Sequence, residues 1–195
     1  MSFIGGTQVE LLYSLAAPVT KNTYTTTAAI SALAASANVA TIPGGMLAVQ
    51  DPNPVGRAFY LKAAGTIANA ATGNTFFPSL VLSTTPGTSL NPIAIYPTTA
   101  PTASTTCQWE MEAWITCQAA GLSGGTTFQV NGNWHQGIVA SGLAITATSL
   151  WAQFAGNLTG YSASAPTYVE LFGTWSGSSA SATTTVQQMF LFGLN

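Results

Sequence analysis

The chain has 195 residues, of which 47% are hydrophobic but only 4% are charged, against about 25% charged residues in an ordinary globular protein. Its three basic residues and net charge of −2 exclude the cation clusters with which proteins bind nucleic acids or anionic membrane surfaces. The length suits one domain with a hydrophobic core, and the apolar fraction is too high for intrinsic disorder.

The first twenty residues are interpreted as an arm (residues 1–20) that precedes a sandwich domain (residues 21–195). The arm carries more apolar side chains than a free tail in water should hold, so we expect it to attach the protein to a partner. The predicted attachment residues are Phe3, Ile4, Val9, Leu11, Leu12 and Tyr13. An alternative stays open, in which residues 8–14 add a strand to the sandwich.

Segments that are bounded by Gly, Pro, Ser and Thr clusters predict about ten short strands. In residues 108–118 one face holds Trp109, Met111, Ala113, Ile115 and Cys117, and the other holds Gln108, Glu110, Glu112, Trp114 and Thr116. The other predicted strands are residues 8–14, 24–30, 38–42, 57–65, 75–83, 126–136, 149–156, 167–176 and 183–192. This pattern predicts an all-β sandwich or jelly roll, with a helix at residues 28–37 as a local alternative.

The two cysteines, Cys107 and Cys117, belong to one predicted strand. An extended chain would hold them about 33 Å apart, whereas a disulfide needs Cα atoms within about 7 Å. We therefore predict two free thiols on the buried face, as in a protein made in a reducing cytosol. Neither a secretory signal nor a membrane span is expected.

The last predicted strand is apolar on both faces. Val186, Phe190 and Phe192 are expected to point one way, and Met189 and Leu191 the other. A strand of this kind must be covered on both sides, and a second subunit would supply the outer cover. The predicted subunit interface is Met189, Phe190, Leu191 and Phe192. The scarcity of charge fits this interpretation, because a buried charge is costly in an interface.

Three patterns that would indicate chemistry are weak. The G-x-S-x-G match at residues 121–125 precedes a strand rather than a helix, so it is interpreted as a hairpin loop. Glu110 and Glu112 share a face about 6.6 Å apart, but they are expected to lie on a solvated or interface surface opposite Lys62. One histidine, His135, and two distant cysteines make no zinc site. No catalytic residue, cofactor or metal site is predicted.

The order of several segments resembles a known family. These segments are residues 22–27, 40–47, 56–65, 78–82 and 109–115. They resemble the jelly-roll virion proteins of tailed bacteriophages, especially head decoration (cement) proteins and related fibre heads. The resemblance covers roughly residues 20–195 and rests on strand patterns. It implies a jelly roll similar to the tumour-necrosis-factor fold, usually a homotrimer, attached to a capsid.

From this resemblance we expect a non-catalytic decoration protein that is made in the host cytoplasm, binds the major capsid protein and stabilises a phage head. The alternative is a tail or fibre receptor-binding module, similar to a lectin, that recognises a host glycan. Exposed loop aromatics would favour this alternative, and the candidates are Trp134, Trp151 and Tyr161.

Overall fold

The computed structural model describes residues 9–22, 28–30, 39–47, 57–69, 75–89, 91–95, 105–121, 124–139, 150–176 and 182–194. Within these residues every regular element is a strand, apart from one short 3₁₀ turn at Gly44–Leu47. The predicted all-β class is confirmed. No helix in this part of the chain is long and apolar enough to cross a membrane.

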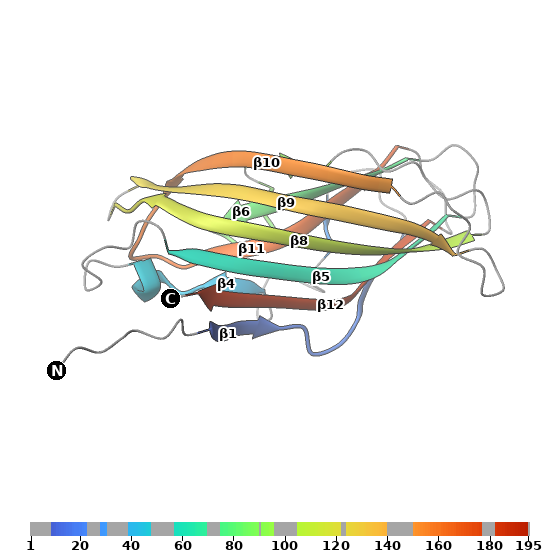
Figure 1. Ribbon diagram of the computed structural model, residues 1–195, viewed down its shortest axis with the longest axis horizontal. Coiled ribbons are helices and arrows are strands. Elements are labelled where there is room, and N and C mark those ends of the chain that lie inside the picture. Colours follow the sequence, from blue (N-terminus) through green and yellow to red (C-terminus); the bar gives the residue numbers. More distant parts are fainter. Residues whose placement is uncertain are drawn as a thin grey trace.

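Seven antiparallel strands form one sheet, called the large sheet below (Figure 1). Their order is β1–β12–β5–β8–β9–β10, and β2 also pairs with β12. The bounds are β1 (Val9–Ser14), β2 (Val19–Asn22), β5 (Ala58–Asn69), β8 (Thr105–Ala119), β9 (Thr126–Val139), β10 (Leu150–Tyr161) and β12 (Thr183–Leu194).

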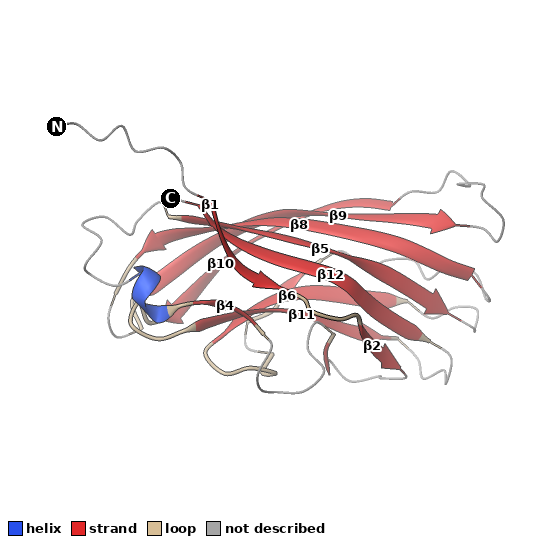
Figure 2. Ribbon diagram, turned by 90° about the horizontal axis from the view of Figure 1, so that it is seen from below, coloured by secondary structure: helices blue, strands red, loops and turns tan. Residues whose placement is uncertain are grey.

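Five strands form the small sheet, in the order β3–β11–β6–β7 with β4 also paired to β11. Their bounds are β3 (Ala28–Ala29), β4 (Ala40–Ile42), β6 (Phe76–Ser83), β7 (Ile93–Ala94) and β11 (Thr167–Trp175). Figure 2 shows β4, β6 and β11 below the strands of the large sheet, so the two sheets form a sandwich. Along the described strands the chain changes sheet six times, after β2, β4, β5, β7, β10 and β11. The strands β8, β9 and β10 follow one another in one sheet, and the jelly-roll topology stays a prediction.

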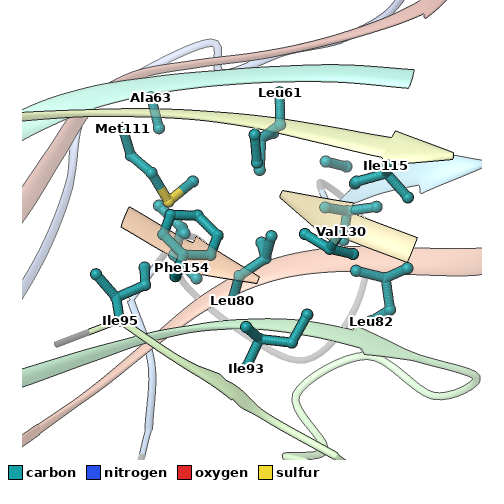
Figure 3. Close-up of a cluster of buried hydrophobic side chains, with 14 of the residues drawn as sticks. Leu61, Ala63, Leu80, Leu82, Ile93, Ile95, Met111, Ile115, Val130 and Phe154 are labelled. Carbon is teal, nitrogen blue, oxygen red and sulfur yellow. The ribbon is translucent and has the colours of Figure 1, made fainter. Parts of the chain in front are cut away.

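The core lies between the sheets, where strand alternation turns apolar side chains inward. Figure 3 shows Leu61, Met111 and Val130 of the large sheet facing Leu80 and Leu82 of the small sheet. In β8 the predicted alternation is confirmed: every second residue from Cys107 to Cys117 is buried.

The strand predictions agree with the structure wherever it describes them. Each predicted segment contains a strand, although the long strands β5, β8, β9, β10 and β12 run beyond their predicted ends. The short strands β2 and β7 were not predicted. Ala28–Ala29 is a strand, so the alternative helix does not begin there, and residues 31–38 lie outside the described residues.

The N-terminal segment requires a correction, because β1 and β2 both pair with β12. The boundary that we predicted at residue 20 therefore does not separate an arm from the sandwich. This pairing supplies hydrogen-bond partners for the backbone groups along one edge of β12. A bulge between Leu11 and Tyr13 accompanies the turn of Leu12 and Tyr13 onto the core.

The prediction for β12 also requires a correction. A bulge between Val186 and Gln188 shifts the alternation by one residue, so that Val186 faces the core with Met189 and Leu191, all three fully buried. Phe190 is on the opposite face and half-buried. Met189 and Leu191 therefore belong to the core of a single chain and are excluded from the predicted subunit interface.

The prediction for the cysteines is confirmed, since Cys107 and Cys117 are both free and buried. Burial raises the pKa of each thiol, which further lowers its reactivity.

Candidate functional site

The outer face of the large sheet, meaning the face turned away from the small sheet, collects most of the exposed apolar surface. Among the described residues five large hydrophobic side chains are exposed. Four of them, Val9, Leu11, Trp114 and Trp151, are on this sheet, and the fifth, Phe77, is on the small sheet. Isolated exposed apolar residues need no explanation, but a gathering on one face indicates a contact surface.

Cross-strand pairing aligns two of these side chains, Leu11 and Trp114, in a row across the sheet with the half-buried Phe192 and Tyr60. Leu11 lies opposite Phe192, Phe192 opposite Tyr60, and Tyr60 opposite Trp114. The ring centroids are 4.7 Å apart for Tyr60 and Trp114, and 6.3 Å apart for Tyr60 and Phe192. Phe190 extends this aromatic row, with its ring 6.2 Å from that of Phe192.

One ion pair lies beside the aromatic row. Lys62 Nζ is 3.3 Å from Glu112 Oε1, and both side chains are almost half exposed, as we predicted for this strand pair. The pKa of Tyr60 is raised to about 12, first by burial and then by the hydrogen bond and charge of Glu112. The Tyr60 hydroxyl therefore stays protonated at neutral pH and donates to Glu112.

An open depression of about 420 Å³ lies at the other end of the row, over β8, β9 and β10. It is lined by Trp114, Asn131, Gly132, Asn133, Gln153, Phe154 and Ala155. Trp114 is opposite Asn131 on β9, and Asn133 is opposite Gln153 on β10. We call this feature the amide depression, because its polar side chains are all amides.

The floor of the amide depression depends on a glycine. A Cβ atom at Gly132 would lie 2.3 Å from the ring of Phe154 and 2.5 Å from the carbonyl oxygen of Glu112. Phe154 points into the sandwich among Met111 and Leu80 (Figure 3). Without a side chain at position 132, the Phe154 ring packs against the strand and closes the floor.

Of the three aromatic residues predicted to contact a glycan, two are buried and one is exposed. Trp134 is fully buried and stacks on Trp109 at 4.7 Å. Tyr161 is buried, and its hydroxyl donates to the carbonyl oxygen of Leu82 at 2.7 Å. Both residues are on strands and point inward, not on exposed loops. The prediction that they contact a glycan is therefore wrong.

Trp151 alone of the three is exposed, with its ring 5.5 Å from that of His135. Trp114, which is 49% exposed, was not predicted as a glycan contact. The alternation of β8 had already placed it on the face of Glu110 and Glu112, so the signal was present in the sequence.

The predicted attachment residues are also divided. Val9 and Leu11 are more than half exposed, whereas Leu12 and Tyr13 pack against the core. Phe3 and Ile4 lie outside the described residues. Ser123 of the G-x-S-x-G match is outside them too, and in the described part of the chain no three potential metal ligands of the His, Cys, Asp or Glu type come together.

No protein-family model and no curated protein matches the chain. One similar solved structure is the CBM2 module of the evolved Dit of Lactobacillus casei BL23 phage J-1. It is 11% identical, the match covers 98% of each chain, and the TM-score is 0.32. A likeness at this level carries no argument about function.

Proposed function

We propose that this protein is a non-catalytic structural subunit of a tailed-phage virion, which forms a homotrimer and decorates the capsid. The observation that carries the proposal is the aromatic row on the outer face of the large sheet. It continues over β1 to Leu11 at the end of the sheet.

The end of the row on β1 and β12 suits contact between copies of the chain, and its Trp114 end is left open. Burial of apolar surface contributes about 25 cal/mol per Å², and aromatic pairs add about 0.5–1.5 kcal/mol each. The charges beside the row, Lys62 on β5 and Glu112 on β8, are already paired within the chain, so a partner that covers the β1 and β12 end of the row buries few unpaired ions. Phe190 and Phe192 are the interface residues that this proposal retains.

Attachment to the major capsid protein is assigned to the β1 end. β1 is the last strand in the order of the large sheet, so one of its edges has no partner strand among the described residues. An open edge of this kind accepts a strand from another protein through main-chain hydrogen bonds. Val9 and Leu11 would supply exposed apolar contacts beside it, and the sequence-predicted Phe3 and Ile4 are retained as attachment residues.

A truncation separates attachment from folding. Deletion of residues 1–8 removes Phe3 and Ile4 but leaves β1 whole, and it is compared with the full chain in a cryo-EM map of decorated particles. We expect the truncated protein to keep its fold and its trimer and to occupy fewer capsid sites. Equal occupancy would contradict the attachment role of these residues, and density for the full chain on the tail alone would contradict decoration.

The receptor-binding alternative is favoured by one specific observation. The amide depression places a half-exposed tryptophan beside amide side chains, which is the kind of site a glycan-binding module uses. Density at the tail tip or on a fibre would support this alternative.

A further inference from the structure

We propose that the amide depression is a binding site for an uncharged saccharide, with the Trp114 ring as its apolar platform. The inference does not depend on the trimer or on the place of the protein in a virion. It rests on the lining of the depression, the support of Trp114 and the distribution of charge around both.

The lining combines the two kinds of group that a sugar ring requires. A pyranose has an apolar face of C–H groups, which packs on an exposed aromatic ring, and Trp114 is 49% exposed. Its hydroxyls both donate and accept hydrogen bonds. Asn and Gln side chains also do both, and the depression holds Asn131, Asn133 and Gln153.

The platform is held in place before any ligand binds. The Trp114 ring packs against the Tyr60 ring at 4.7 Å with an interplanar angle of 43°. The hydroxyl of Tyr60 is held in turn by Glu112, which the 3.3 Å ion pair with Lys62 fixes. A site on paired strands with supported side chains loses less entropy on binding than a loop does.

The charges exclude other classes of ligand. None of the lining residues is charged, and the nearby cation, Lys62, is paired with Glu112. Phosphate and carboxylate ligands therefore have no cation to bind. A peptide that adds a strand would pair along the edge of β10, whereas the depression lies over the faces of β8, β9 and β10. An uncharged ligand with many hydroxyls remains.

The outer face supplies a matched control. Trp151 is also an exposed tryptophan, at 61%, but it is not among the residues that line the depression. A general affinity of tryptophans for sugars would involve both residues, whereas the proposed site involves Trp114 alone.

The test is a titration of the full-length, ¹⁵N-labelled chain with glucose, galactose, mannose, N-acetylglucosamine, N-acetylgalactosamine and their disaccharides. Indole and side-chain amide signals are followed by NMR. For at least one sugar we expect saturable shifts of the Trp114 indole and of the Asn131, Asn133 and Gln153 amides. The Trp114→Ala variant should weaken binding by about tenfold, and Trp151→Ala by less than about twofold.

Two further measurements complete the test. Light scattering on each variant shows whether a loss of binding accompanies a change of oligomeric state. The Gln153→Ala variant repeats the sugar titration at a residue away from the aromatic row. Sialyllactose is compared with lactose as the charged probe, and we expect it to bind no more tightly. The proposal is overturned if no sugar shifts these signals, if Trp151→Ala weakens binding as much as Trp114→Ala, or if sialyllactose binds more tightly than lactose.

Discussion

The outer faces of the two sheets differ in what covers them. On the small sheet Val81, Glu170 and Phe172 point away from the core between the sheets, yet each is at most 1% exposed. On the large sheet the outward residues Trp114 and Trp151 are 49% and 61% exposed. The outer face of the small sheet is largely covered within the chain, although Phe77 is 41% exposed there, whereas the large sheet holds the other four exposed large hydrophobic residues. The large sheet therefore offers the contact surface.

A buried carboxylate helps to close the face of the small sheet. Glu170 Oε2 accepts a hydrogen bond of 2.9 Å from the backbone N–H of Gly87. This bond ties the loop after β6 to β11. Seven of the eight residues of β6 are buried. The strand that is covered on both faces is therefore β6, whereas we had predicted β12.

The largest effect is expected where neighbouring residues of β12 face opposite sides of the large sheet. Leu191→Asp places an unpaired charge in the core and should lower the free energy of unfolding by more than about 4 kcal/mol. Phe190→Asp points outward and should cost about 1 kcal/mol or less in the fold. Urea unfolding monitored by tryptophan fluorescence measures both, and similar losses in the two variants would contradict the bulge-shifted alternation.

A smaller effect on stability is expected from two glycine substitutions in β9, one on its inner face and one on its outer face. Gly132→Ala forces its Cβ against Phe154 and the Glu112 carbonyl and should cost about 1–3 kcal/mol. The control is Gly137→Ala in the same strand, where a Cβ meets no atom within 4 Å, and it should be neutral or slightly stabilising. Thermal unfolding of both variants measures this difference in stability. Equal melting temperatures would show that the floor of the depression does not need a glycine.

The smallest effect concerns the closed face of the small sheet and depends on pH. Burial raises the pKa of Glu170 above its ordinary value of 4.5, although hydrogen bonds from Gly87 and Ser83 oppose the shift. The folded chain therefore holds this proton more tightly than the unfolded chain, and stability falls as the pH rises from 4.5 through the raised pKa.

Glu170→Gln removes this titration, so the variant should melt at a higher temperature than the native chain at pH 7 and gain less at pH 4. Glu110→Gln is the control on the open face, because Glu110 is exposed, and it should change the free energy of unfolding by less than about 0.5 kcal/mol. A lower melting temperature for Glu170→Gln at pH 7 would contradict the raised pKa.

Sequence reasoning succeeded where the outcome depends on local alternation. The period of two in β8 predicted the buried cysteines and the outward direction of Glu112 and Trp114. It failed where the outcome depends on another strand. The bulge after Val186 reversed the facing of that residue, and the pairing of β1 with β12 depends on contacts between the two ends of the chain. The amide depression joins residues of three strands, so only the register between them could reveal it.

The central claim is that the open face of the large sheet holds copies of the chain together, and the most direct test is the mass of the native protein in solution. Multi-angle light scattering on the native chain and on Phe190→Asp gives both masses under the same conditions. The account predicts three times the mass of one chain for the native protein and the mass of one folded chain for the variant. A stable native monomer, or a trimer that Phe190→Asp leaves intact, would contradict it.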